Sequence, residues 1–350
     1  MELQKIYSAE TKILTAFAES RIGGRQENQD SYGWKDTKLG YLVTVCDGMG
    51  GGPGGKTAST IAVEEIIAGI ADSIGDEAVP NVIIKAIRRA NMAIIERGNE
   101  VPALAGMGST ATVLLVNEKS AFIAHVGDSR VYQLRGHNKV FRTFDHSLVF
   151  DMVSQGVITE EQARLSAQSN VITRALGVKP DVEVEIHEVA YEKGDRFVLC
   201  SDGIHGTMPE NELLKMFTAK NAKLGVTTDN IAASVDNLGR SGGGGHDNLT
   251  LAIVEMNINS KKKAKMSKQT KYIIGCLVAL FAISLSLNMI QCSSRGSVCS
   301  GSKNTSADSC KMLKDSLQRK EEAMAKIDSL LQKDKKMGKY ATDKIKQIMK

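Results

Sequence analysis

The sequence predicts an α+β fold built on antiparallel sheets, and two observations carry this prediction. Apolar runs between residues 111 and 134 follow one another with short polar connections and no helix between them. Consecutive strands of this kind favour antiparallel pairing over a doubly wound parallel sheet. Amphipathic segments before and after these runs predict helices in addition to the sheets. We interpret residues 1–257 as one domain.

Three segments are expected to be helical. The first, from Thr57 to Ala71, mixes apolar and acidic positions along its length. The second, from Asn81 to Gly98, places its apolar residues on a helical period. A third helical stretch is expected from Leu148 to Gln168, where it interrupts the series of strands.

The expected strands are short apolar runs bounded by turn residues. In chain order they are Tyr41–Cys46, Ala111–Val116, Ala121–Val126, Arg130–Leu134, Val182–Val189, Phe197–Ser201 and Leu249–Glu255.

Aspartates stand beside glycine or another small residue at the ends of these strands. They are Asp47 after residues 41–46, Asp128 after 121–126, Asp202 after 196–201 and Asp247 before 249–254, and a fifth, Asp30, ends the segment 25–30. Mg²⁺ and Mn²⁺ prefer oxygen ligands, and glycine lets backbone carbonyls and water come close. The pattern therefore predicts a site for two or more metal ions in a hydrolase.

Seven motifs occur in order over residues 20–257. They are Arg25-x-x-Asn28-Gln29-Asp30, Asp47-Gly48-Met49-Gly50-Gly51, Gly108-Ser109-Thr110-Ala111, His125-Val126-Gly127-Asp128-Ser129-Arg130, Ile172-Thr173-Arg174-Ala175-Leu176-Gly177, Ser201-Asp202-Gly203 and His246-Asp247-Asn248. In this order they resemble the bacterial members of the type 2C metal-dependent protein serine/threonine phosphatases. The resemblance implies a sandwich of two antiparallel β-sheets flanked by α-helices, with the metals at one end.

The resemblance also implies metal ligands. Asp47 would bridge two ions of Mn²⁺ or Mg²⁺, and the carbonyl of Gly48 would bind one of them. Asp202 and Asp247 would complete the ligands of the first ion. Asp128 would help to hold a weaker third ion.

Two further residues would join Asp47 in the catalytic set. Asp30 would hold a water on the metals, and Arg25 would bind the substrate phosphate. Two cations roughly 3.5–4 Å apart lower the pKa of a shared water. A guanidinium binds phosphate bidentately and stays charged. Residues 139–177 would contain a mobile flap beside the site.

The expected activity is hydrolysis of phosphoserine and phosphothreonine in proteins, in opposition to a serine/threonine kinase. Met49 stands where many eukaryotic relatives have a histidine linked to protonation of the leaving group, and methionine cannot donate that proton. A water on the metals, or His125 or His146 if close, could take this role. Gln29 replaces an acidic residue of eukaryotic relatives.

Residues 50–57 give a rival interpretation. Gly50-Gly-Gly-Pro-Gly-Gly55-Lys56-Thr57 matches the P-loop pattern between a strand and a helix, which would indicate a nucleoside triphosphatase. Several adjacent glycines make such a match easy to obtain, and an antiparallel sheet does not suit that fold. We therefore rank it below the phosphatase.

Two more classes of protein fit the sequence less well. A cysteine-based phosphatase needs an arginine six residues after its cysteine, but glycine occupies that position after both Cys46 and Cys200. A pseudophosphatase that binds phosphoproteins as a scaffold would be indicated by loss of Asp47, Asp202 or Asp247, and all three are present.

The C-terminal part of the chain predicts a membrane anchor. Residues 272–290 hold no charged side chain over 19 residues, which is long enough to span a bilayer as a helix. Residues 258–271 form a linker with six lysines from 261 to 271. Because lysines directly adjoin the span, we expect the catalytic domain in the bacterial cytoplasm, one pass through the inner membrane, and residues 291–350 in the periplasm.

The tail itself is basic, with 14 Lys and Arg against 7 Asp and Glu. Its residues 311–350 are expected to be helical, with a short coiled coil and a solvated amphipathic helix equally open. Cys292, Cys299 and Cys310 would permit a disulfide or a dimer through the tail. No nucleic-acid partner is expected, because residues 1–260 are acidic overall.

Overall fold

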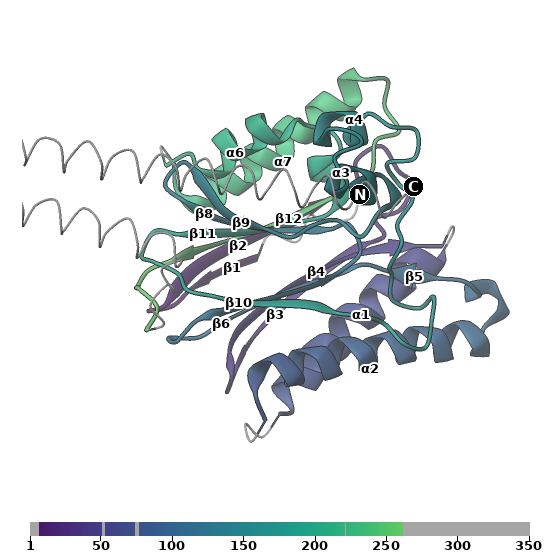
Figure 1. The fold of residues 1–350 in the computed structure, drawn as a ribbon, viewed down its shortest axis with the longest axis horizontal. Helices are drawn as coiled ribbons and strands as arrows, with labels where there is room; N and C mark the ends of the chain where they lie inside the picture. The colour runs from purple at the N-terminus through teal and green to yellow at the C-terminus, as the bar shows by residue number, and fades with distance from the viewer. Residues whose placement is uncertain (1–6, 51–52, 74–76, 221, 262–350) are drawn as a thin grey trace, which may run out of the picture. The chain divides into compact units, whose positions relative to one another are not determined.

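Two antiparallel sheets lie face to face in the computed structural model, which describes residues 7–50, 53–73, 77–220 and 222–261 (Figure 1). The first sheet has the strand order β1-β2-β12-β11-β8-β9. Its strands are β1 Tyr7–Glu10, β2 Leu14–Arg21, β8 Arg130–Arg135, β9 Asn138–Arg142, β11 Arg196–Cys200 and β12 Leu249–Met256.

The second sheet has the strand order β10-β7-β6-β4-β3, and β5 pairs with the end of β4. Its strands are β3 Asp30–Thr37, β4 Gly40–Met49, β5 Gly108–Ser109, β6 Ala111–Val116, β7 Ala121–Val126 and β10 Glu185–Val189. Every pairing in both sheets is antiparallel, as the short connections predicted.

Helices cover the outer face of each sheet (Figure 1). The long helices α1 and α2 lie on the second sheet, and α6 and α7 lie on the first. The helices of the described residues are α1 Pro53–Ala71, α2 Val79–Glu100, α3 Leu148–Ser154, α4 Glu160–Arg164, α5 Asp202–His205, α6 Glu210–Phe217 and α7 Leu224–Ser241, with a 3₁₀ turn at Pro102–Leu104.

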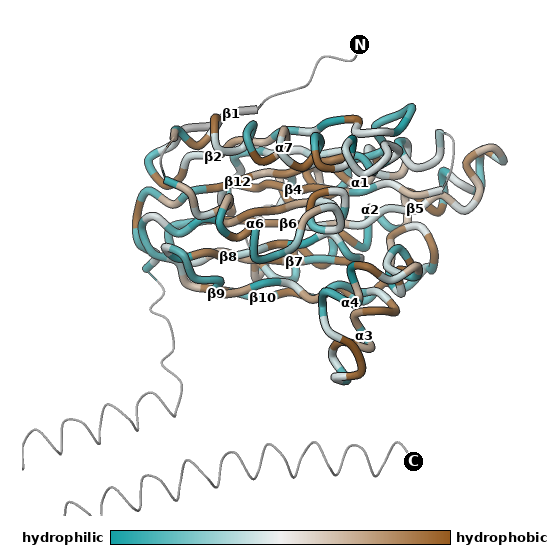
Figure 2. The backbone as a smooth tube through the Cα atoms, turned by 90° about the horizontal axis from the view of Figure 1, so that it is seen from above, coloured by the Kyte–Doolittle hydropathy of each residue, from teal (hydrophilic) through white to brown (hydrophobic). Residues whose placement is uncertain are grey.

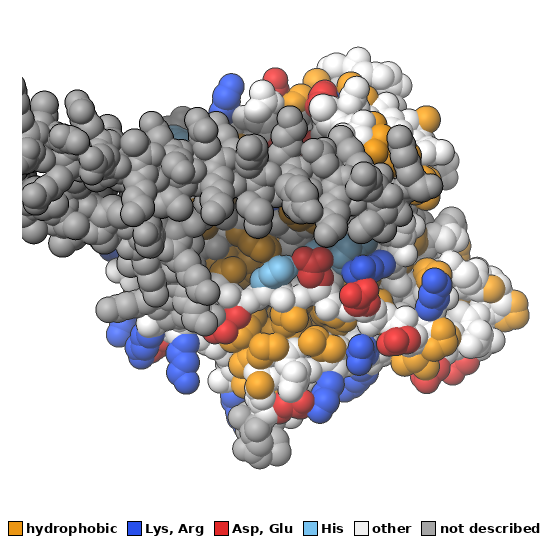
Figure 3. Space-filling model, viewed as in Figure 1, with side chains coloured by type: hydrophobic (Ala, Val, Ile, Leu, Met, Phe, Trp, Pro, Cys, Tyr) orange, Lys and Arg blue, Asp and Glu red, His pale blue; other side chains and the backbone are white. Residues whose placement is uncertain are grey.

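Three apolar layers hold this arrangement together. Residues of β2, β4, β11 and β12 meet between the two sheets, where Val45 and Leu199 are fully buried. A second layer lies between α1, α2 and the second sheet, and a third lies between α6, α7 and the first sheet. Figure 2 shows apolar residues along the strands, and α3 and α4 projecting from the rest of the unit. On the face drawn in Figure 3, acidic and basic side chains are interspersed.

Several predicted elements are confirmed with small changes of length. Both predicted long helices form, and each extends beyond the predicted bounds as α1 and α2. Strands β6 and β7 have the predicted bounds, and all of their residues are buried. The apolar face predicted for the second helix is the face that α2 buries, at Val82, Ile83, Ala86, Ile87, Ala90 and Ile94.

The predicted helix at 148–168 is wrong as a single element, because the structure has two short helices there. Ser147 accepts a hydrogen bond from the Phe150 amide at the start of α3. Gly156 then adopts a φ of 71°, which favours glycine and ends the helix. Thr159 starts α4 with a capping box to Gln162.

The predicted strand at 182–189 also begins later than expected. The ladder of β10 with β7 starts where Glu185 pairs with His125, beside the last residue of β7. Val182 is buried against α2 and the second sheet without entering the ladder. Its apolar side chain therefore reflects packing rather than strand pairing.

The chain divides into residues 1–265 and 266–350, and every described residue belongs to the first unit. No helix in that described part is both long and apolar enough to cross a bilayer. The predicted span at 272–290 and the tail at 291–350 lie outside the described residues.

Candidate metal centre

Five aspartates lie where strand ends of the two sheets approach each other. Asp30 begins β3 and Asp47 lies near the end of β4, and the two are direct cross-strand partners. Asp202 begins α5 directly after β11, and Asp247 precedes β12. Asp128 lies in the turn that leads from β7 in one sheet to β8 in the other. The fold thus brings together all five aspartates that the sequence selected.

The electrostatics of these groups show that they crowd one another. Burial, together with the charges of Asp202 and Asp247, raises the pKa of Asp30 to about 7. Burial and the charge of Asp247 raise the pKa of Asp202 to about 6. The pKa values of Asp47 and Asp128 also lie well above their ordinary range, mainly through burial and then through neighbouring aspartates. Bound cations would relieve the mutual repulsion of these carboxylates.

The residues fit hard divalent cations. The Oδ1 atoms of Asp30 and Asp202 are buried and have no hydrogen-bond partner among the described residues. A buried carboxylate oxygen without a partner is costly, and a cation would satisfy it. The donor set consists of oxygen atoms only, which suits Mg²⁺ or Mn²⁺.

Gly48 fits the same interpretation, because its position admits no side chain. A Cβ there would lie 2.0 Å from the Gly55 carbonyl oxygen and 2.7 Å from that of Gln29. The backbone beside Asp47 is therefore tightly packed and fixed. Its predicted role as a carbonyl ligand stays a prediction.

Residues to which the sequence assigned no role hold the aspartates in place. Thr110 exchanges two hydrogen bonds with Asp47: its amide donates to the Asp47 carbonyl at 2.8 Å, and its Oγ1 accepts from the Asp47 amide at 2.9 Å. Ser201 donates to Asp30 Oδ2 at 2.8 Å. Asn248 accepts from the Gln29 amide at 2.8 Å, which joins the segment of Asp30 to that of Asp247. Thr110, Ser201 and Asn248 all lie in the motifs given above, and this was the one indication in the sequence that they belong to the site.

Arg25 lies at the edge of the centre. Its Nη2 donates to Asp247 Oδ2 at 2.8 Å, and half of its side chain is exposed. The remaining guanidinium N–H groups are open to solvent or to an anion. This placement is compatible with the predicted contact to phosphate.

The structure gives no support to His125 or His146 as the proton donor considered from the sequence. Their rings stack with centroids 4.4 Å apart. Their polar contacts among the described residues go to the Phe144 carbonyl, the Gly127 amide, Glu185 and Arg174, and to none of the five aspartates. Burial and the neighbouring His125 lower the pKa of His146 to about 4, so the ring is neutral near pH 7.

The same histidines, together with Glu185, form a group of potential ligands among the described residues, with atoms within 4.8 Å of one another. However, the Arg174 guanidinium lies 3.4 Å from His146 Nε2, so a cation there would face a positive charge. We favour the aspartate centre, because its donors are all oxygen atoms and because its buried Asp30 and Asp202 oxygens have no hydrogen-bond partner among the described residues.

The rival P-loop interpretation does not fit the described residues. Lys56 Nζ donates to the Asp30 carbonyl at 2.8 Å and to Ser31 Oγ at 3.1 Å, so it ties α1 to β3. Thr57 Oγ1 donates to the Pro53 carbonyl within the same helix. Both side chains that would bind phosphate and magnesium are used inside the fold.

The carboxylate cluster predicts a pH-dependent stability of the protein stripped of divalent ions. The pKa values of Asp30 and Asp202 are higher in the folded protein than in the unfolded chain. At pH values between the unfolded and the folded pKa, the folded state therefore binds more protons than the unfolded state. Stability is therefore greatest at low pH and is lost as the pH rises through the folded values. We expect the Tm to be lower at about pH 8 than at about pH 5 by on the order of 5 °C.

Mn²⁺ should remove most of that difference, because the cation replaces the protons. Differential scanning calorimetry with and without Mn²⁺ measures both effects. A metal-free Tm that stays constant or rises over this pH range would contradict the description of the cluster.

Comparison with known proteins supports the same interpretation. The family profile described as Protein phosphatase 2C matches residues 19–235. The chain is 32% identical over 241 residues to "Serine/threonine phosphatase stp" of Listeria monocytogenes, covering 68% of this chain and 93% of that protein. It is also 32% identical over 236 residues to "Protein phosphatase PhpP" of Streptococcus pneumoniae, covering 67% and 93%.

Solved structures agree in fold. Serine/threonine phosphatase Stp1 from Staphylococcus aureus superposes with a TM-score of 0.64 at 28% identity, covering 69% of this chain and 94% of that one. The catalytic domain of the phosphatase PstP, solved in complex with two manganese ions, gives a TM-score of 0.58 at 28% identity and covers 70% and 98%. With the aspartates, the sandwich and the matched profile in agreement, the chain belongs to the protein phosphatase 2C family.

Proposed function

We propose that this protein is a phosphatase that hydrolyses phosphoserine and phosphothreonine in other proteins at a centre of two Mn²⁺ or Mg²⁺ ions, with a weaker third ion near Asp128. The observation that carries the proposal is a pair of buried oxygens, Asp30 Oδ1 and Asp202 Oδ1, which have no hydrogen-bond partner in the described part of the chain and lie within a cluster of five aspartates. The relatives named as serine/threonine phosphatases support the substrate class.

Each residue contributes in its own way. When bound, the two cations supply a lowered pKa for water and offset the charge of the phosphoryl group. Asp47, Asp202 and Asp247 would bind those ions. Both the backbone N–H and the backbone carbonyl of Asp47 are hydrogen-bonded to Thr110, which holds this residue in place. Asp30 would orient the attacking water through its free Oδ1, and Arg25 would orient the phosphate.

The test is Mn²⁺-dependent release of phosphate from a phosphothreonine peptide, run beside ATP hydrolysis on the same preparation. The proposal expects phosphate release from the peptide that stops when Mn²⁺ is chelated, with no comparable ATP hydrolysis. Hydrolysis of ATP without hydrolysis of the peptide would instead support the interpretation as a nucleoside triphosphatase. Binding of the peptide without hydrolysis would favour the pseudophosphatase scaffold.

Met49 leads to a prediction about the leaving group. It ends β4 and pairs with Gly108, so the position usually linked to leaving-group protonation carries a thioether. An aryl phosphate needs no proton on its leaving group and should be hydrolysed preferentially over phosphoserine. Met49→His should narrow that preference by on the order of tenfold, which is less than a fully developed general-acid effect.

Met49→Leu is the matched control and should leave the ratio of the two substrates unchanged. If the histidine variant has the same ratio as the leucine variant, position 49 has no part in protonating the leaving group.

We also propose that residues 272–290 anchor the phosphatase in the inner membrane, with the catalytic domain in the cytoplasm, facing substrates of a serine/threonine kinase that it opposes. The tail would lie in the periplasm and could form a dimer through its cysteines. The support is the uncharged run of 19 residues beside the lysine-rich linker.

A membrane-impermeant maleimide applied to intact spheroplasts after mild reduction tests this topology. Labelling is expected at Cys292, Cys299 and Cys310. Cys46 and Cys200 are fully buried in the catalytic domain and serve as internal controls that stay unlabelled. Tail cysteines that react only after lysis would place the tail on the same side as the phosphatase domain.

A further inference from the structure

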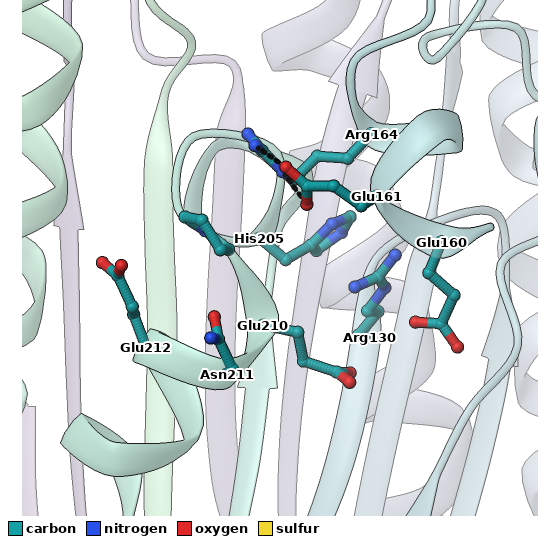
Figure 4. A pocket seen from close by; sticks show the side chains of 9 residues that line it. Arg130, Glu160, Glu161, Arg164, His205, Glu210, Asn211 and Glu212 are labelled. Carbon is teal, nitrogen blue, oxygen red and sulfur yellow. Dashed lines mark hydrogen bonds and ion pairs between the residues drawn. The ribbon is translucent and has the colours of Figure 1, made fainter.

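A cavity of about 600 Å³ opens between the start of β8, helix α4 and helices α5 and α6. Figure 4 shows side chains from these elements pointing into it. Its position links it to the metal centre: His205 on its lining donates from Nε2 to the Asp128 carbonyl at 3.0 Å. His205 also follows Asp202 by three residues in the same short helix.

The cations of this cavity are already neutralised within the fold. Arg130 donates from Nε and Nη2 to both carboxylate oxygens of Asp145 at 2.7 Å, and only 7% of its side chain is exposed. Arg164 donates to both oxygens of Glu161 and to the Gly206 carbonyl. Neither arginine is therefore available as a receptor for an anion.

The carboxylates outnumber the arginines on this lining, with Glu160, Glu161, Glu210 and Glu212 against Arg130 and Arg164. Glu160 pairs with Arg142 and Glu161 pairs with Arg164, and their side chains remain 41% and 53% exposed. Glu212 is exposed and makes no ion pair among the described residues. The lining therefore carries a net negative charge, to which Glu212 contributes, and this charge attracts an entering cation.

A second feature of the cavity points to a hydrogen-bond donor as its ligand. His205 is 7% exposed, and its Nε2 donates to a carbonyl, so Nδ1 is the acceptor of the neutral ring. Among the described residues, no hydrogen bond is made to this Nδ1. A lone pair on the lining of an acidic cavity is satisfied by an N–H group of a cation.

We propose that this cavity binds the side chain of an arginine or lysine that flanks the phosphorylated residue of the substrate. The inference rests on the proposed phosphatase function and narrows its substrate class to phosphoproteins with a basic residue near the phosphorylated site. The carboxylates of the lining attract the charge, and His205 accepts one of its N–H groups. Arg130 and Arg164 are held by Asp145 and Glu161, and the glutamates that outnumber them keep the lining acidic as a whole.

The experiment uses the full chain with Mn²⁺ and a set of phosphothreonine peptides in which one arginine is moved through each position on either side of the phosphothreonine. The measured quantity is the ratio of kcat/KM for each peptide to that of its glutamine counterpart, so that any general loss of activity cancels. At one position of the arginine this ratio should reach roughly five, the size expected of partly exposed ion pairs. Glu161→Gln combined with Glu212→Gln should reduce that ratio toward one through KM.

Two further measurements sharpen the test. Glu212→Lys should invert the preference, whereas Glu96→Lys, an exposed charge reversal on α2, should leave the ratio as in the native chain. A peptide with trimethyllysine keeps the charge but has no N–H group, so it should bind less well than lysine if His205 is an acceptor.

The outcomes separate this inference from the proposed function. Hydrolysis of every peptide at one rate would overturn the inference and leave the phosphatase intact. An arginine preference that persists unchanged in both Glu212 variants would place basic recognition elsewhere on the protein and also overturn it. Failure of all peptides to release phosphate with Mn²⁺ would refute the proposed function itself.

Discussion

Replacing Asp47, Asp202 or Asp247 with Asn is expected to lower kcat/KM by on the order of 1,000-fold or more, as for other central catalytic groups. An amide keeps the size of the side chain but cannot neutralise a cation. Asp47 should show the largest loss, because its carboxylate is the one expected to contact both ions. Activity is measured at saturating Mn²⁺ with a phosphothreonine peptide.

The fold of these variants should survive. The hydrogen bonds that hold Asp47 to Thr110 are made by its backbone, which the substitution does not change. Removing one of several mutually repelling carboxylates should raise the Tm of the metal-free protein and reduce the additional stabilisation by Mn²⁺. Asp36→Asn, an exposed aspartate of β3, is the matched control and should leave activity and Tm unchanged.

Activity of Asp47→Asn within a few-fold of the native protein would refute a centre of two ions at these residues. A variant that is inactive but no longer unfolds cooperatively would instead show a structural loss, which is why Tm and Mn²⁺ affinity are measured on the same samples.

Arg25→Ala is expected to lower kcat/KM by roughly 10- to 100-fold, the size of a charged, bidentate contact to phosphate. KM should rise if the contact is equal in the ground and transition states, and kcat should also fall if the contact strengthens in the transition state. Arg25→Lys is the matched variant, because it keeps the charge and loses the planar pair of donors.

Arg25 also contacts Asp247 at 2.8 Å, so its removal frees a proposed ligand from a positive neighbour. Calorimetric titration with Mn²⁺ should give an affinity equal to or tighter than that of the native protein. Weaker Mn²⁺ binding, or unchanged kinetics on the peptide, would make Arg25 a structural residue of the loop.

The parts of the fold that the sequence predicted are those in which burial determines the residue pattern. Strands β6 and β7 are buried on both faces, so their residues form unbroken apolar runs. Helix α2 buries one face only, which gives a regular period. Strand β3 was missed because most of it is polar and half-exposed, and α7 was missed because buried threonines stand among its apolar positions.

The site shows a similar division. The five aspartates were found because each stands beside a glycine or other small residue at the end of an apolar run. The partners of these aspartates were not assigned, because Ser201 and Asn248 act across the two sheets and Thr110 acts from a position distant in sequence. Lys56 was misleading for the same reason, since its contact with β3 depends on how α1 packs. The role of His205 beside Asp128 depends on a contact between residues 77 positions apart.

The distribution of the aspartates between the two sheets has a thermodynamic consequence. Asp30 and Asp47 are cross-strand partners in one sheet, whereas Asp202 and Asp247 flank the paired strands β11 and β12 of the other. Cations held by both pairs would join the sheets at one end, and the apolar layer around Val45 and Leu199 joins them in the middle. Ion affinity and packing between the sheets then belong to one linked equilibrium. Truncation of the Val45 side chain would therefore weaken Mn²⁺ binding. Conversely, bound Mn²⁺ would slow the hydrogen exchange of backbone amides in strands that it does not contact.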